Sequence, residues 1–247
     1  MNKIVMLWAT PRSTSTAFEW MMRMRGDMIC FHEPYGESWY KGDEARWPRL
    51  TADSPRVPGL TPAVVSERIA SAAEQGPVFI KDMPMHVDHL WSDDFLAPFT
   101  HTFIIRDPGK VLTSIYAKEP EWTTTECGFA QQHALFMRLM QETGTPPITI
   151  DSDDLLADPH SMVDAYCRAV GIPFIPEALS WEPGARAEVS WYDGGSWHDI
   201  LANSDGLKPQ PRRDQVDISE APDKVKQWYD QFMPLYQEMH RYRLVVK

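Results

Sequence analysis

The chain has 247 residues and a formal net charge of −11, with 35 acidic side chains against 24 lysines and arginines. This length suits one large α/β domain over residues 1–247, and the acidic balance without a basic stripe argues against a nucleic-acid partner. No run approaches about eighteen apolar residues, so no membrane span is expected, and the widely spaced Cys30, Cys127 and Cys167 predict reduced core thiols of a cytoplasmic protein.

The first two predicted elements are joined by a turn rich in hydroxyl groups. The apolar run of residues 3–8 predicts a strand, and residues 15–25 predict a helix because apolar side chains recur on one face. Residues 11–16, between them, read Pro-Arg-Ser-Thr-Ser-Thr, which is not a Walker A loop. Unpaired N–H groups and the helix dipole attract anions at such a place, and Arg12 adds a full charge. The segment therefore predicts an anion cradle.

The next segment contains a short strand and then an irregular stretch. Residues 28–31 predict a strand, and Glu33 follows it closely. Residues 34–60 are rich in proline, glycine, tryptophan and charged residues, which predicts a long loop. Such a loop is uncommon unless it has a function. Its aromatic residues either line a ligand pocket or pack on one another, namely Trp39, Tyr40 and Trp47.

Two further predicted strands end in a cation. A helix over residues 62–75 precedes a strand over 78–81 that ends in Lys81, and a strand over 101–106 closes with Arg106. Asp107 and Pro108 then suit the N-cap and the first position of a helix. Ser114 lies on that helix, eight residues after Arg106 and off its apolar face.

The remaining elements continue the alternation of strands and helices. They are a helix over 127–143, a strand over 148–150, a helix over 161–170, an irregular stretch over 181–222 and a helix over 224–242. Alternation of this kind predicts an α/β fold of three layers, a mostly parallel sheet flanked by helices. Ligands bind at the carboxyl ends of such strands. We therefore expect four strand-end side chains to converge: Arg12, Glu33, Lys81 and Arg106.

Three segments resemble the sulfotransferase family in the right order. Residues 11–16 resemble its 5′-phosphosulfate loop, although Arg12 stands where Lys is common and Thr14 where Gly is common. We therefore expect this turn to do without a residue at positive φ. Arg106 and Ser114 resemble the family's 3′-phosphate site, and residues 148–173 resemble its sequence of strand, acidic turn, Asp-Pro, helix and glycine.

The resemblance is to bacterial-type, small-molecule members, and it implies a P-loop NTPase-like fold. It also implies transfer of a sulfuryl group from 3′-phosphoadenosine 5′-phosphosulfate (PAPS) to a hydroxyl of a small-molecule acceptor, without a metal. The residues that would bind the donor are Arg12, Ser13, Thr14, Ser15, Thr16, Arg106 and Ser114. Lys81 stands at the Lys of the family's Lys-Thr-His-Leu-Pro stretch. With Arg12 it would stabilise the transferring group.

The resemblance also assigns the two irregular regions. Residues 34–60 would lie on the acceptor side, and residues 181–247 would form a C-terminal cap. In the family a late glycine-containing loop closes over the nucleotide, a role open here to Trp197 or to Gly194 and Gly195.

The proton acceptor is predicted from position. The family's histidine is replaced here by Met83, whereas Glu33 stands where other members have a glutamate. We expect Glu33 to be the base, with a pKa raised by exclusion of water. Asp82 and His86 remain alternatives, while strand alternation is expected to point His32 to the other side.

Two other functions stay open at this stage. One is a nucleotide or small-molecule kinase of similar fold, although the chain has no Walker loop. The other is a non-catalytic nucleotide-binding protein with a sulfotransferase-like shell, because a histidine and a glycine of the family pattern are replaced. The sequence predicts neither the identity of the acceptor nor the oligomeric state.

Overall fold

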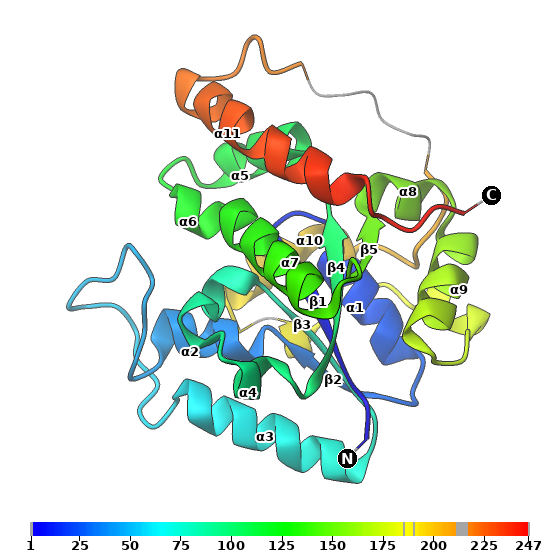
Figure 1. Cartoon of the computed structure of the whole chain (residues 1–247). Helices are drawn as coiled ribbons and strands as arrows, with labels where there is room; N and C mark the ends of the chain where they lie inside the picture. The colour runs from blue at the N-terminus through cyan, green and yellow to red at the C-terminus, as the bar shows by residue number, and fades with distance from the viewer. Residues whose placement is uncertain (1, 185, 190, 211–216, 247) are drawn as a thin grey trace.

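A sheet of five parallel strands forms the centre of the computed structural model, which describes residues 2–246 except 185, 190 and 211–216. Its strand order is β2-β3-β1-β4-β5. The strands are β1 (Ile4–Ala9), β2 (Ile29–His32), β3 (Val78–Asp82), β4 (Phe99–Ile105) and β5 (Ile148–Asp151). The predicted parallel α/β sheet is therefore confirmed, and its helices cover both faces (Figure 1).

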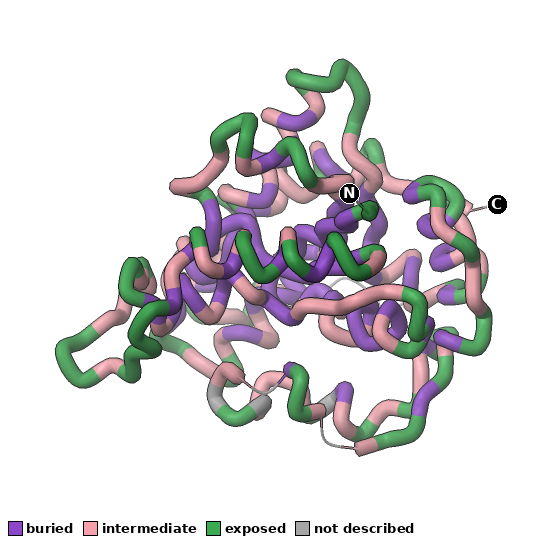
Figure 2. Tube along the Cα trace, turned by 90° about the horizontal axis from the view of Figure 1, so that it is seen from below, coloured by how far each residue is buried: buried purple, intermediate pink, exposed green. Residues whose placement is uncertain are grey.

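The central strand β1 is buried on both sides, as expected of a strand in a covered parallel sheet. Val5, Leu7 and Ala9 pack on one face, against α1 (Ser15–Met24) and α9 (Pro159–Val170). The alternate residues of β1 pack on the other face, against α3 (Pro62–Gln75) and α7 (Phe129–Thr143). This alternation makes the three layers, with the buried residues gathered in the middle of the molecule (Figure 2).

A further hydrophobic cluster joins α5 (Pro108–Lys118) to the last helix, α11 (Asp223–His240). The Asp107 side chain accepts hydrogen bonds from Gly109 N and Lys110 N, so it caps α5 as predicted. The two helices lie side by side in Figure 1. The start of α5 is thereby fixed at the carboxyl end of β4.

The loop predicted over residues 34–60 is wrong in its first part. Residues Pro34–Lys41 form helix α2, in which Pro34 takes the first turn and Tyr35, Trp39 and Tyr40 are buried. These side chains recur at helical spacing, but the flanking proline, glycine and charged residues hide the period. Within the predicted loop, the part from residue 42 onward does lack helix and strand. The stretch from residue 42 to 61 projects from the body of the molecule (Figure 1).

The predicted helix over 127–143 is in fact two helices. The α6 helix (Thr124–Cys127) ends at Gly128, whose φ of +74° turns the chain into α7. A Cβ at Gly128 would lie 2.9 Å from Met85 Sδ, so glycine also permits close packing here. Several short elements were not predicted: α4 (Asp93–Leu96), α8 (Ser152–Ala157), α10 (Asp199–Ala202) and five 3₁₀ turns, η1 (Pro84–His86), η2 (Asp88–Leu90), η3 (Pro176–Leu179), η4 (Ala187–Val189) and η5 (Asp193–His198).

Two predictions from composition concern the cysteines and membrane-spanning helices. All three cysteines are free, with Cys127 and Cys167 buried and Cys30 half-buried, as predicted. Within the described residues, no helix combines the length and the apolarity needed to cross a bilayer.

Candidate active site

The loop after β1 has a strained but well-supported backbone. Arg12 and Thr14 adopt φ values of +60° and +67°, so the expectation of a turn without positive φ is wrong. Such values are costly for residues other than glycine and persist where the surroundings impose them. Ser13 Oγ donates to Thr10 O at 2.6 Å, and Ser152 Oγ donates to Ser13 O at 2.5 Å. The Ser13 hydroxyl therefore supports the loop, with its hydrogen committed inside the protein.

Helix α1 begins at this loop with backbone N–H groups that have no acceptor among the described residues. The first intrahelical bond runs from Phe18 N to Thr14 O at 3.1 Å, after the amides of Ser15, Thr16 and Ala17. No side-chain cap is recorded at Thr14, and the first turn carries no acidic residue. Ser15, Thr16 and Ala17 line a cavity of about 270 Å³. The helix start is thus open to an anion from the cavity.

The cations predicted for phosphate binding lie together beside the loop. Arg12 Nε donates to Ser114 Oγ at 2.9 Å, and Arg12 Nη1 donates to Trp197 O at 2.9 Å. Arg106 Nη1 donates to Arg12 O at 2.6 Å. Arg12 and Arg106 both line the cavity. The structure therefore brings together the ends of β1 and β4 and the middle of α5, as the sequence predicted.

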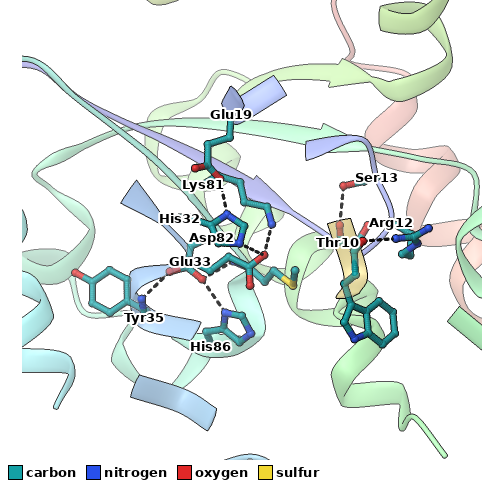
Figure 3. A network of polar contacts seen from close by, with 12 residues as sticks. Thr10, Arg12, Ser13, Glu19, His32, Glu33, Tyr35, Lys81, Asp82 and His86 are labelled. Atoms are coloured by element: carbon teal, nitrogen blue, oxygen red, sulfur yellow. Dashed lines mark hydrogen bonds and ion pairs between the residues drawn. The ribbon is translucent and has the colours of Figure 1, made fainter. Parts of the chain in front are cut away.

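A buried ion pair joins Lys81, on β3, to Glu33, the residue that follows β2 (Figure 3). Lys81 Nζ donates to Glu33 Oε1, and both residues line the cavity. Only 1% of the Lys81 side chain and 9% of the Glu33 side chain are exposed. Burial by itself would raise the pKa of Glu33, but the charge of Lys81, followed by that of His32, holds it well below its usual range. The expectation of a raised pKa is therefore wrong for this structure.

His32 does not line this cavity, as alternation predicted, yet its ring lies close to Glu33. Glu33 adopts a φ of +44°, so the strand geometry ends at His32 and the rule of opposite faces no longer applies. His32 Nε2 is 3.8 Å from Glu33 Oε1, and His32 Nδ1 is 2.5 Å from Glu19 Oε2 (Figure 3). The glutamate and the histidine thus belong to one polar network.

Asp82 and His86, the alternative bases, lie behind the cavity wall and fasten α2 to β3. Asp82 accepts hydrogen bonds from Tyr35 N and Met83 N, each at 2.8 Å, and its Oδ1 is 2.7 Å from His86 Nδ1. Neither residue lines the cavity, whereas Met83 does. Their described contacts are those of a buried structural pair.

Of the three aromatic residues singled out in the predicted loop, only Tyr40 lines the cavity. Trp39 packs against Tyr40, with ring centroids 4.8 Å apart, and Trp47 Nε1 donates to Glu126 Oε1 at 2.8 Å. The aromatic residues therefore divide between the two predicted roles. The cavity's other aromatic lining residues are Trp122, Tyr192 and Trp197.

The late segment, predicted to form a C-terminal cap, contributes part of the cavity lining. Trp197 lines the cavity, while Gly194 is not among its described lining residues. His198 also lines the cavity, although the sequence analysis did not predict it there. Burial, followed by the charges of Lys81 and His32, lowers the pKa of His198 to about 3. No pattern in the sequence places an isolated histidine of an irregular region near a strand end.

Comparisons with known proteins agree with this architecture. A family model described as a sulfotransferase domain matches residues 2–240. The solved sulfotransferase domain from the Synechococcus PCC 7002 olefin synthase is 15% identical, with a TM-score of 0.57 and coverage of 94% of this chain and 95% of that one. At this identity the likeness shows the fold.

Two curated relatives from Arabidopsis thaliana are branched-chain-amino-acid aminotransferase-like proteins 2 and 1. They are 24% identical over 214 residues and 25% identical over 186 residues. The matches cover 87% and 75% of this chain, but only 38% and 33% of the relatives, so the chain spans little more than a third of their length. Since the family model covers nearly the whole of it, the chain belongs to the sulfotransferase domain family.

Proposed function

We propose that this protein transfers a sulfuryl group from PAPS to a hydroxyl of a small-molecule acceptor. One observation carries the proposal: the open start of α1 with Arg12 and the buried Lys81–Glu33 pair face the same cavity. The first is suited to hold an anionic donor, and the second to act on the group being transferred.

The described residues fit the two anionic ends of the donor. The 5′-phosphosulfate suits the amides of Ser15, Thr16 and Ala17 together with the Arg12 guanidinium. The 3′-phosphate suits Arg106, with Ser114 as a hydroxyl partner. When bound, the donor supplies a sulfuryl group already attached to a phosphate leaving group. The proposed transfer uses no metal ion.

Lys81 and Glu33 would carry the chemistry at the transferring group. A preorganised ammonium in a site closed to water stabilises charge on oxygen strongly, because little reorganisation is needed. Glu33 would remove the proton of the acceptor hydroxyl. The hydrogen bonds that fix the loop of residues 10–16 would hold the donor in line with that hydroxyl.

The acceptor side of the cavity is largely apolar. Tyr40 and Tyr192 pack with ring centroids 4.6 Å apart, and both line the cavity together with Met83. Burial, followed by the neighbouring Tyr192, raises the pKa of Tyr40 well above its usual value, so its hydroxyl stays protonated. Flat apolar walls of this kind suit an alcohol or phenol with an apolar body.

Calorimetric titration tests the nucleotide preference. We expect 3′-phosphoadenosine 5′-phosphate (PAP) to bind at least about tenfold more tightly than AMP or ATP–magnesium, a difference of about 1.4 kcal/mol or more. Turnover of PAPS with a panel of phenols and alcohols then tests transfer. Preference for ATP–magnesium would favour the kinase, and tight PAP binding without transfer to any acceptor would favour the non-catalytic protein.

A further inference from the structure

A second ionisable pair, Glu19 and His32, lies next to Glu33. Glu19, on α1, has a fully buried carboxylate, of which Oε1 is 2.8 Å from Arg23 Nη2 and Oε2 is 2.5 Å from His32 Nδ1. The His32 side chain is only 2% exposed. A buried carboxylate that accepts from one ring nitrogen fixes the tautomer and leaves the other nitrogen as a base. That other nitrogen, Nε2, is the one that faces Glu33.

His32 also lines a cavity different from the one that Glu33 lines. Glu33 lines the first cavity, where the acceptor would bind. His32 lines a second cavity of about 390 Å³, together with Arg23, Cys30 and Trp191. The imidazole therefore borders the second cavity and also lies, through Nε2, 3.8 Å from the carboxylate that lines the first cavity.

The charges around Glu33 make it a poor place for a proton to remain. Lys81 holds its pKa low, so a proton taken from the acceptor must move on. Besides His32, the rings of His86 and His198 lie near Glu33, and His86 Nδ1 is held by Asp82 Oδ1 at 2.7 Å. His198 packs edge-to-face on His32 with ring centroids 5.2 Å apart, but its pKa is lowered to about 3. His32 instead has the carboxylate of Glu19 to balance a positive ring.

We propose that His32, held by Glu19, is the positioning residue that receives the acceptor's proton through Glu33. This inference rests on the proposed function. As the acceptor oxygen bonds to sulfur and the bond from sulfur to the leaving phosphate oxygen breaks, the O–H proton passes to the Glu33 carboxylate. It then passes to His32 Nε2, across a separation of 3.8 Å that one bridging water or a shift of about 1 Å closes. Release of the proton through the second cavity restores the neutral ring.

The tautomer of His32 is the first test, and it needs no turnover. Long-range ¹H–¹⁵N spectra of histidine-labelled protein at neutral pH should show the Nδ1–H form, with the signal assigned by its loss in His32→Asn. In Glu19→Gln we expect a mixture of tautomers, because the amide can accept from the ring or donate to it. An Nε2–H form or a doubly protonated ring in the unaltered protein would overturn the relay.

Kinetics provides the second test, with a matched control in the same chain. His133 and Glu238 form another pair, with His133 Nε2 at 2.7 Å from Glu238 Oε2, and line neither cavity. Glu19→Gln and His32→Asn should lower kcat by about 10- to 100-fold while PAP affinity and the KM for PAPS change less than twofold. His133→Asn and Glu238→Gln should leave kcat within twofold.

Chemical rescue separates the relay from a merely structural role. In His32→Ala, added imidazole that enters the second cavity should raise kcat at least about tenfold over that of the variant alone, without changing KM. Absence of rescue in a variant that still binds PAP, or a normal kcat in Glu19→Gln and His32→Asn, defeats the relay alone. Absence of transfer in the unaltered protein defeats the proposed function itself.

Discussion

Glu33 and Lys81 compensate each other's charge in a place with almost no access to water. Removing one partner of such a pair costs more than the pair itself contributes, because the other charge is left buried and unpaired. The sign of the pH effect follows from the lowered pKa of Glu33. The stabilisation from this pair is complete above the pKa of the unfolded glutamate and is lost as the pH falls towards the pKa in the folded state.

We expect Glu33→Gln to lower kcat by about 10²- to 10⁴-fold, the usual contribution of a positioned base. PAP affinity should change much less, because Arg12 and Arg106 are untouched. Glu33→Asp, which keeps the charge but withdraws it by one carbon, is the control and should retain more activity than the glutamine. Thermal unfolding of both variants must show a folded protein, and near-normal turnover of Glu33→Gln would remove it from the role of base.

Arg106 supports the loop and, on the proposed function, also binds the 3′-phosphate. Arg106→Ala removes its hydrogen bond to Arg12 O, so some affinity for any nucleotide should be lost. We expect an additional loss of about 1.5–3 kcal/mol for PAP relative to AMP, the cost of deleting a charged partner. Calorimetric titration of both nucleotides measures the difference. Equal losses would show that Arg106 acts only on the loop.

Among the elements, α1 begins with a residue that its backbone does not favour. Thr14 is β-branched and has a φ of +67°. We expect Thr14→Gly to raise the free energy of unfolding by up to about 1 kcal/mol through relief of this strain. Thr16→Gly, two residues later in the helix, is the control and should lower it by about 0.3 kcal/mol. Urea unfolding compares the two, and parallel losses would contradict the strain.

Strands β1 and β4 are joined by a side-chain contact that depends on pH. Trp8 Nε1 donates to His101 Nδ1 at 2.9 Å, so His101 Nε2 carries the hydrogen that faces Leu96 O at 3.1 Å. Burial is the main cause that lowers the pKa of His101 to about 4. The hydrogen bond from Trp8 requires the neutral ring, because Nδ1 must act as an acceptor. Its stabilisation is complete above the unfolded value of about 6.5 and is lost as the pH falls from there to about 4.

We therefore expect the stability difference between the protein and His101→Asn to shrink by up to about 3 kcal/mol between pH 6.5 and pH 4. Asparagine keeps an acceptor for Trp8 but does not titrate. Urea unfolding at several pH values measures the difference, and His160→Asn, at an exposed position, is the control. A difference that stays constant with pH would contradict the assignment.

The elements also show which features a sequence can predict. Apolar runs and caps such as Asp107 marked the five strands and the long helices, because burial and capping leave local patterns. The α2 helix was missed because one buried face of eight residues is short beside its unfavourable neighbours. The break at Gly128 was missed because the apolar period continues across it.

At the scale of the whole molecule, the parallel sheet determines where the site lies. Every strand of such a sheet ends at the same edge, so strand-end positions alone predicted that Arg12, Lys81 and Arg106 would meet. The positive φ of Glu33 has no signal in the residue type, and the position of His198 depends on how a late segment packs over the sheet. Those two features decide which groups surround the Glu33 carboxylate, and only the folded structure shows them.

Arg12 differs from Lys81 in one further respect: its described hydrogen-bond acceptors, the Ser114 hydroxyl and the Trp197 carbonyl, carry no charge. An incoming phosphate need not displace a carboxylate there. After transfer, the spent nucleotide would lose the contact with Lys81 but retain those with Arg12 and Arg106. We therefore expect PAP to be a strong product inhibitor, competitive against PAPS.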